Sequence, residues 1–351
     1  MSTARIAGLG WVTPLGADLA TVWQRISAGE MPEQKLLTNP ETGAIHRYLA
    51  VPPKLVDHLA RNPRLRRSSA ISYYAAAAGL AALENAGAKL DAAGAARTAI
   101  VFAISDGGVI YTRKFYEQIV KQGANLASPL LFPETVYNAP ASHLAAQLGL
   151  DGASYTLVGD NSVGLAALKF GEQLLELGGV DRVLVVGAEE IDWVICEAYR
   201  DWRLARTSVP AQPDAPWKAW LGEGAAALVL AREGAVALDA VHPGVSFQRR
   251  RDAGAAIDRV LADLARGGAV DRVVSCANGT FADAAEAAAV ARYFSTRSQN
   301  VLIPKRALGE APGASALLQV ICAALEIRLG KCDRVLVPVV GFNQQASGAI
   351  V

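Results

Sequence analysis

A strand-turn-helix pattern in the middle of the chain has the form that many enzymes use to hold a nucleophile. Residues Ser154–Val158 read as an apolar strand and Val163–Leu177 as an amphipathic helix, joined by the turn Gly-Asp-Asn-Ser at 159–162. Backbone N–H groups at a helix start can stabilise negative charge beside such a nucleophile. Asp160, Asn161 and Ser162 are equally the residue types that cap a helix. The turn therefore admits a catalytic and a structural interpretation.

The bulk composition limits what the chain can bind. At 351 residues it can bury one large core or two packed halves, and its net charge of +1 gives no reason to expect a nucleic acid partner. The four cysteines lack C-x-x-C spacing and lie in apolar sequence, so we expect reduced thiols, no metal site and no cofactor. Because the sequence shows neither a membrane span nor a signal peptide, we expect a cytoplasmic protein without membrane contacts.

Three similar segments suggest how the chain is organised. Residues 178–190, 267–280 and 330–342 each pass from a helical pattern through Gly and Asp-Arg into a β-branched apolar run. Repetition of this unit predicts alternating helices and strands, with sheets covered on both faces. Pro and Gly around Glu233–Gln248 place a junction between an N-terminal half, 1–232, and a C-terminal half, 233–351, within one compact unit.

Periodicity predicts the individual elements. Strands are expected at Arg5–Gly8, Thr98–Ala103, Tyr155–Val158, Val183–Val186, Ala225–Leu230, Val273–Cys276 and Val335–Val340. Helices are expected at Leu19–Ala28, Ala70–Ala86, Ala139–Leu148, Val163–Leu177, Ala253–Arg266, Ala284–Phe294 and Gly313–Leu329. The Pro- and Trp-rich stretch Arg200–Ala219 is expected to be irregular.

Several motifs, in order along nearly the whole chain, resemble those of one family. They are IAGLGWVTPLG near the N-terminus, GVDRVLVVGAEE, GEGAAALVLA, NGTFADAAEAAAVARYF, PKRALGEAPGASALLQVICAALEI and VVGFNQQAS. Together they resemble the β-ketoacyl synthases, condensing enzymes of fatty-acid and polyketide synthesis. The resemblance implies an α/β, thiolase-like fold, in which two similar αβαβα halves pack as a five-layered structure.

The resemblance also shows which catalytic residues have changed. The family uses a Cys that becomes acylated and two His residues that assist decarboxylation and stabilise the enolate. The Cys position falls on Asn161, because the Gly-Leu-Ala-Ala-Leu that follows it is present at 164–168. The His positions fall on Asn278, in ANGT, and on Glu310, in ALGEAPGA. An amide forms no thioester and transfers no proton near neutral pH, so the resemblance implies a member that does not condense by itself.

Other family positions are retained or altered around this site. Lys305, Thr280 and Asp283 are retained, and Phe342 with Asn343 and Gln344 is expected to line a pocket. The glycines of the family's Gly-Phe-Gly-Gly are replaced at these last two positions.

Three interpretations of function follow. The first is a partner subunit of an active ketosynthase, similar to the chain-length factors of type II polyketide systems, in fatty-acid or polyketide (including polyene) biosynthesis. Such a chain would dimerise near Ser154–Val158, with the ketosynthase or with itself, and Arg61–Arg67 and Arg249–Arg251 could receive an acyl carrier protein. The second is an acyl-processing enzyme that uses Glu310. The third is a self-associating module that binds an acyl chain or an acyl carrier protein.

Three smaller features also allow two interpretations each. Cys276 could be a displaced nucleophile, although its apolar setting favours a packed thiol. Glu310 could be an acid or base with a raised pKa, or a salt-bridge partner of Lys305. The Ser-Asp-Gly-Gly run at 105–108 could cradle an anion or form a turn.

Overall fold

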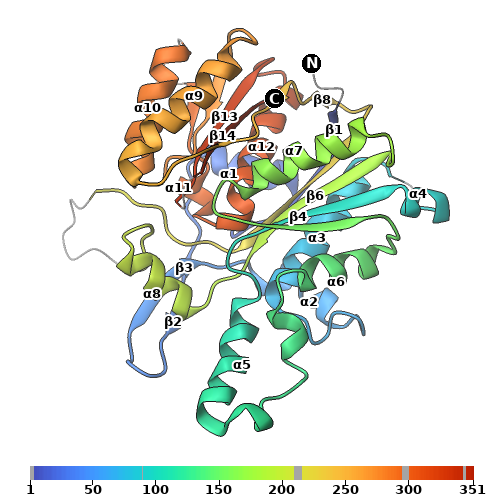
Figure 1. Cartoon of the computed structure of the whole chain (residues 1–351), viewed down its shortest axis with the longest axis vertical. Coiled ribbons are helices and arrows are strands. Elements are labelled where there is room, and N and C mark those ends of the chain that lie inside the picture. The colour runs from blue at the N-terminus through green and yellow to red at the C-terminus, as the bar shows by residue number, and fades with distance from the viewer. Residues whose placement is uncertain (1–3, 89, 209–215, 295–299, 343–344) are drawn as a thin grey trace.

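Two sheets organise the chain in the computed structural model, which describes residues 4–88, 90–208, 216–294, 300–342 and 345–351 (Figure 1). In the first sheet β4 lies between β5 and β6 and runs parallel to both, whereas β7 runs antiparallel to β6 and β1. Its strand order is β5 (Ser154–Val158), β4 (Thr98–Ile104), β6 (Arg182–Glu189), β7 (Gly224–Ala231), β1 (Arg5–Val12) and β8 (Val236–Ala237).

The second sheet is built from the C-terminal part of the chain. Strand β11 pairs in parallel with β12 and β13, and β14 pairs antiparallel with β13. Its order is β10 (Val245–Ser246), β14 (Gln345–Ile350), β13 (Val335–Val340), β11 (Arg272–Val274) and β12 (Val301–Leu302), and β9 (Ala240–Val241) also pairs with β14. A separate hairpin joins β2 (Gln34–Thr38) to β3 (Ile45–Leu49).

Helices cover both sheets and make five layers. Helices α3 (Ala70–Asn85) and α6 (Ala139–Leu148) form one outer layer, with α3 packed on β1, β6 and β7 of the first sheet. Helices α7 (Val163–Glu176) and α12 (Pro312–Arg328) lie between the sheets, and α9 (Ala253–Ala265) and α10 (Phe281–Tyr293) form the other outer layer (Figure 1). This arrangement confirms the predicted thiolase-like fold.

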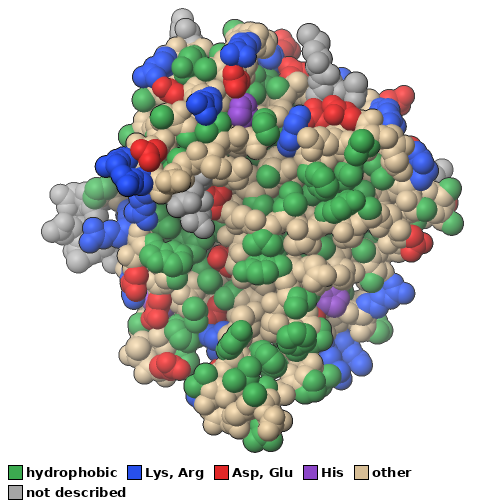
Figure 2. Space-filling view, in the orientation of Figure 1, with side chains coloured by type: hydrophobic (Ala, Val, Ile, Leu, Met, Phe, Trp, Pro, Cys, Tyr) green, Lys and Arg blue, Asp and Glu red, His purple; other side chains and the backbone are tan. Residues whose placement is uncertain are grey.

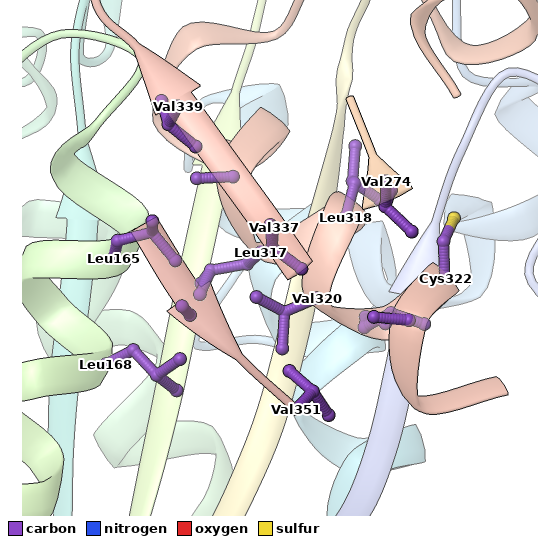
Figure 3. Close-up of a cluster of buried hydrophobic side chains, with 14 of the residues drawn as sticks. Leu165, Leu168, Val274, Leu317, Leu318, Val320, Cys322, Val337, Val339 and Val351 are labelled. Atoms are coloured by element: carbon purple, nitrogen blue, oxygen red, sulfur yellow. The ribbon is translucent and has the colours of Figure 1, made fainter. Parts of the chain in front are cut away.

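The middle layer is packed closely because its helices carry small residues. A Cβ atom on Gly164 of α7 would lie only 3.0 Å from side-chain atoms of Ala316 and Leu317 of α12. Figure 3 shows Leu165 and Leu168 of α7 packed with residues of α12 and β13, all of them buried. Since α12 is apolar on nearly every side, it fits only between two sheets.

Most predicted elements appear within a residue or two of their expected bounds, and the larger differences have local causes. Strand β1 continues to Val12 through Gly8 and Gly10, two positions where a Cβ atom would overlap the backbone of α3. Helix α10 begins at Phe281, earlier than predicted, because the Thr280 hydroxyl accepts a hydrogen bond from the N–H of Ala282. Strand β11 ends at Val274, earlier than predicted.

Of the remaining helices, only α1 was predicted from periodicity. They are α1 (Leu19–Ser27), η1 (Pro53–Leu55), α2 (Asp57–Ala60), α4 (Ala92–Ala96), α5 (Val109–Gln122), η2 (Ala124–Leu126), η3 (Phe132–Thr135), α8 (Trp193–Asp201), η4 (Arg250–Asp252) and α11 (Lys305–Leu308). Helix α8 ends just inside the stretch 200–219 that was expected to be irregular, and residues 209–215 lie outside the described ranges. The division at 232/233 stays a prediction; β8, just beyond it, pairs with β1 in the first sheet.

Candidate functional site

The turn between β5 and α7 lies at an edge where several strands end. Strands β4, β5 and β6 are parallel, so their carboxyl ends share that edge, and the N–H of Gly159 donates to the carbonyl of Ile104 at 3.1 Å. Ligands of open α/β sheets bind at such an edge. Asn161 follows directly and is 1% exposed. The predicted strand-turn-helix unit is therefore present, with a buried amide at its tip.

The hydrogen bonds at this turn differ from the expected helix cap. The backbone N–H and the hydroxyl of Ser162 donate to Oδ1 of Asp160 at 2.9 and 2.8 Å. Ser162 occupies the N-cap position of α7, but its side chain makes no capping hydrogen bond. Neither Oδ1 nor Nδ2 of Asn161 has a hydrogen-bond partner within the described residues. The carboxylate of Asp160 therefore holds the turn, whereas the side chain of Asn161 makes no hydrogen bond within the described residues.

Asn278 and Glu310, which the sequence motifs align with the family's two His positions, meet in one buried network. Nδ2 of Asn278 donates to Oε2 of Glu310 at 2.8 Å, and Nζ of Lys305 donates to the same oxygen at 2.8 Å. The hydroxyl of Thr280 donates to Oδ1 of Asn278 at 2.6 Å. Asp283 accepts the N–H groups of Asn278 and Gly279, each at 2.9 Å. The structure thus brings together the five residues that the sequence placed around the two His positions.

The pair formed by Lys305 and Glu310 is held inside the protein, with side chains 3% and 0% exposed. Burial lowers the pKa of the Lys305 ammonium, but the charge of Glu310, with further contributions from Cys276 and Glu286, outweighs burial and raises it. Lys305 therefore remains a cation paired with Glu310. Of the two interpretations of Glu310, the structure supports the salt bridge with Lys305. Its second oxygen, Oε1, has no hydrogen-bond partner in the described part of the chain.

The thiol of Cys276 forms its hydrogen bonds with residues outside this network. It donates to Oε2 of Glu286 at 2.8 Å, and the N–H of Val340 donates to its sulfur at 3.2 Å. Burial, with the neighbouring Glu286 carboxylate, raises the pKa of this thiol well above its usual value. A protonated thiol that is 1% exposed is not a nucleophile, which supports the packed interpretation.

A second group of polar side chains at the same sheet edge was not found from the sequence. It contains Asp106, Glu189 and Tyr199. Burial raises the pKa of the Tyr199 hydroxyl, as do the nearby charges of Asp106, Glu189 and Glu310, in decreasing order. Burial also raises the pKa of Asp106 to about 7 and that of Glu189 above its usual value. Two consecutive Glu residues after a fully apolar strand were the signal that could have identified this group.

Backbone donors already bind Glu189. The N–H of Asp106 donates to its Oε1 at 3.2 Å, and the N–H of Gly313, at the start of α12, donates to its Oε2 at 3.0 Å. The run at 105–108 therefore acts as a turn that binds a carboxylate of the protein itself. No external anion is needed to explain it.

The expected pocket and docking residues lie in different parts of the structure. Phe342 packs against Tyr199, with ring centroids 6.0 Å apart, whereas Asn343 and Gln344 lie outside the described residues. The Arg residues of the stretches 61–67 and 249–251 are exposed, and the guanidinium of Arg250 lies over the ring of Phe281, 5.2 Å from its centroid. Docking at these residues stays a prediction.

The four cysteines are free thiols. Among the described residues, no group of three or more His, Cys, Asp or Glu side chains is arranged to hold a metal ion. No helix in the described ranges has both the length and the apolar character needed to cross a membrane.

Two domain models of one protein family match the sequence. Residues 2–235 match the model of the beta-ketoacyl synthase N-terminal domain, and residues 229–342 match that of the beta-ketoacyl synthase C-terminal domain. The chain belongs to the β-ketoacyl synthase family.

Individual relatives are distant. The 3-oxoacyl-[acyl-carrier-protein] synthase 2 of Vibrio cholerae is 23% identical over 234 residues, which cover 64% of this chain and 56% of that protein. The Coxiella burnetii protein of the same name is 23% identical over 239 residues, with 64% and 56% covered. The chain therefore spans just over half the length of the curated relatives it matches.

Solved structures agree over almost the whole chain. The ishigamide ketosynthase/chain length factor has a TM-score of 0.80 at 21% identity and covers 99% of this chain and 98% of its own. The ketosynthase ApeO in complex with its chain length factor ApeC, from Xenorhabdus doucetiae, has a TM-score of 0.75 at 18% identity, covering 99% and 97%. At these identities the likeness establishes the fold.

Proposed function

We propose that this chain is a non-condensing ketosynthase homologue that acts as the partner subunit of an active ketosynthase, in the manner of a chain-length factor in fatty-acid or polyketide assembly. The observation that carries the proposal is the buried network in which Lys305 and Asn278 both bind Glu310. This network occupies the two positions where the family has catalytic histidines. The third position holds Asn161, an amide.

The chemistry of these residues argues against condensation by this chain alone. Acyl transfer to the enzyme requires a nucleophile, and the amide of Asn161 is not one. Decarboxylation in the family relies on two imidazoles. Here Asn278 has no titratable group, and the carboxylate of Glu310 forms a salt bridge with Lys305. The side chains of Asn278, Glu310 and Lys305 are nearly fully buried and bond to one another, whereas Asn161 is buried without a hydrogen-bond partner among the described residues.

The exposed apolar surface supports a protein partner. Strand β5 is an edge strand of the first sheet, and Tyr155 and Val158 on it are 40% and 55% exposed. An unpaired strand edge offers backbone groups to a second chain. The region of α5 adds further exposed apolar residues, and Figure 2 shows such side chains gathered over it at the lower end of the molecule. They are Tyr116, Val120, Leu126, Leu130 and Phe132.

The test is co-purification of this chain with a ketosynthase encoded beside its gene. We expect a heterodimer by native mass spectrometry, and condensation that depends on both chains. Val158→Lys should abolish the complex because it places a charge on the edge strand, whereas Leu329→Lys, at the end of α12, should leave it intact. Condensation or acyl labelling by this chain alone would contradict the proposal, and an acyl-binding homodimer would favour a self-associating module instead.

One observation favours a second candidate, an acyl-processing enzyme that uses Glu310. Oε1 of Glu310 is buried without a hydrogen-bond partner among the described residues, and the charge of Glu310 acts on Tyr199. Such atoms can be held ready for a substrate. Glu310→Gln distinguishes the two functions, because an enzyme would lose turnover of an acyl thioester, whereas a partner subunit would still support condensation by the ketosynthase.

A further inference from the structure

A cavity of about 390 Å³ lies in the second sheet, between α10 and the strands β11 and β12. Helix α10 belongs to the outer layer of the molecule, so this cavity is at the periphery of the fold (Figure 1). Its walls are mostly apolar, and its volume falls within the range of about 300–1,000 Å³ typical of small-molecule sites. It is lined by Val273, Ser275, Ala277, Asp283, Glu286, Ala287, Val290, Ala291, Val301 and Ile303.

Glu286 is the side chain of this cavity that has a hydrogen-bond acceptor position left. It is 3% exposed, and its Oε2 accepts the N–H of Cys276 at 3.1 Å and the thiol of Cys276 at 2.8 Å. The hydroxyl of Ser275 also bonds to this carboxyl. A carboxylate has about four acceptor positions, so about one remains. By contrast, Asp283 uses both oxygens to hold the N–H groups of Asn278 and Gly279.

The charges around the cavity favour a cation. Two of the residues that line it are carboxylic acids, and none of those described is Lys or Arg. Lys305 acts on Glu286 electrostatically, but its ammonium is bound to Glu310 and it does not line the cavity. Apolar walls and one buried carboxylic acid with an acceptor position left match a ligand with an aliphatic chain and a single positive head.

We propose that this cavity binds a primary alkylammonium ion, with its head on the carboxylate of Glu286 and its chain against Val273, Val290 and Val301. One N–H of the head can donate to the remaining acceptor position of Glu286. The alkyl chain gains the apolar contacts that the valines offer. The site shares Asp283 with the network of Asn278 and Glu310, but Glu286 makes no hydrogen bond to Asn278, Glu310 or Lys305 among the described residues, and the proposal does not rest on the proposed function.

The protonation of Glu286 makes this binding depend on pH. Burial raises the pKa of its carboxyl to about 7, an effect that Asp283 adds to and that Cys276, Ser275 and Lys305 reduce. A primary alkylammonium keeps its charge up to a pH of about 10. Binding should therefore strengthen as the pH rises through about 7 and then level off.

The test is calorimetric titration of the full chain with n-hexylammonium, 1-hexanol and hexanoate. Above the pKa of Glu286 we expect hexylammonium to bind about tenfold more tightly than hexanol, because a charged hydrogen bond is added. Hexanoate should bind most weakly, since two carboxylates repel. The preference for the ammonium should disappear when the pH is lowered well below the pKa of Glu286.

Two variants and one control test the assignment of residues. Glu286→Gln should remove the preference of ammonium over alcohol, and Ala287→Phe should abolish binding of both by filling the cavity. Glu172→Gln is a matched control, because Glu172 is 2% exposed but lies on α7, away from the cavity. Equal binding of ammonium and alcohol by the unaltered chain would overturn the proposal. So would binding that survives Ala287→Phe, a result that remains decisive even if Glu286→Gln fails to fold.

Discussion

Nζ of Lys305 and Oε2 of Glu310 lie 2.8 Å apart, in a pair of side chains that are 3% and 0% exposed. The same oxygen accepts a hydrogen bond from Asn278, so one carboxylate joins the side chains of Lys305 and Asn278. A carboxylate in this place needs the cation, because an unpaired buried charge is costly. The burial of Glu310 therefore depends on the charge of Lys305.

The first prediction concerns this pair. Lys305→Met removes the cation and leaves Glu310 buried and uncompensated, so we expect the free energy of unfolding to fall by about 3–5 kcal/mol. The double variant Lys305→Met, Glu310→Leu should be more stable than Lys305→Met alone, since no charge remains buried. Urea unfolding of Lys305→Met, of Glu310→Leu and of the double variant measures the coupling. Strictly additive effects would show that the two side chains do not depend on each other.

The second prediction compares two buried amides. Asn161 has no partner for either side-chain atom among the described residues, whereas Asn278 bonds to Glu310 and is bonded by Thr280. Replacing an unpaired amide by an apolar group of similar shape removes a desolvation cost of about 1–3 kcal/mol. We expect Asn161→Leu to keep or raise the free energy of unfolding and Asn278→Leu to lower it.

Urea unfolding of both variants checks this comparison. Equal destabilisation by the two substitutions would mean that the amide of Asn161 has a partner in solution, such as an ordered water molecule.

The third prediction tests access to the turn. A thiol introduced by Asn161→Cys would stand at a position that is 1% exposed, so we expect iodoacetamide to label it slowly in the folded protein and rapidly in urea. Val158→Cys is the matched control, because Val158 lies just before the same turn and is 55% exposed. Equal labelling rates in the folded protein would show that the turn is open to small molecules.

Apolar periodicity predicted the buried helices and strands well and missed several elements at the surface. Helices such as α6 were predicted to the residue, because apolar periodicity and a glycine at Gly149 mark the end of the helix. The hairpin of β2 and β3 was missed, since its strands are short and only His46 and Leu49 in them are buried. Periodicity reports burial on one face, so it identifies core elements and overlooks those at the surface.

The site was anticipated in part. Family motifs located Asn161, Asn278 and Glu310, and a salt bridge of Glu310 with Lys305 was one of two arrangements considered. The hydrogen bond from Asp106 to Glu189 was not anticipated, because it joins residues 83 positions apart in the chain. Spacing along a sequence carries no information about such contacts, which depend on where strand ends meet.

The fourth prediction is a dependence of stability on pH caused by Glu223. Burial raises the pKa of this carboxyl from near 4.5 to about 7, against the effect of its bonds to Ile191, Tyr74 and Val51. Between these values the folded chain holds a proton that the unfolded chain releases, so this contribution is present at low pH and is lost as the pH rises through about 7. It amounts to at most about 3 kcal/mol.

Glu223→Gln should flatten this decline, as measured by urea unfolding from pH about 5 to about 8. Asp106 and Glu286, whose pKa values burial also raises to about 7, contribute with the same sign, so the decline should shrink rather than reverse. Glu117→Gln is the control: Lys121 lowers the pKa of Glu117, so that carboxyl favours folding at higher pH and its removal cannot flatten the decline. An unchanged slope in Glu223→Gln would mean that Glu223 is already ionised in the folded protein at pH about 5, because its three hydrogen bonds then outweigh its burial.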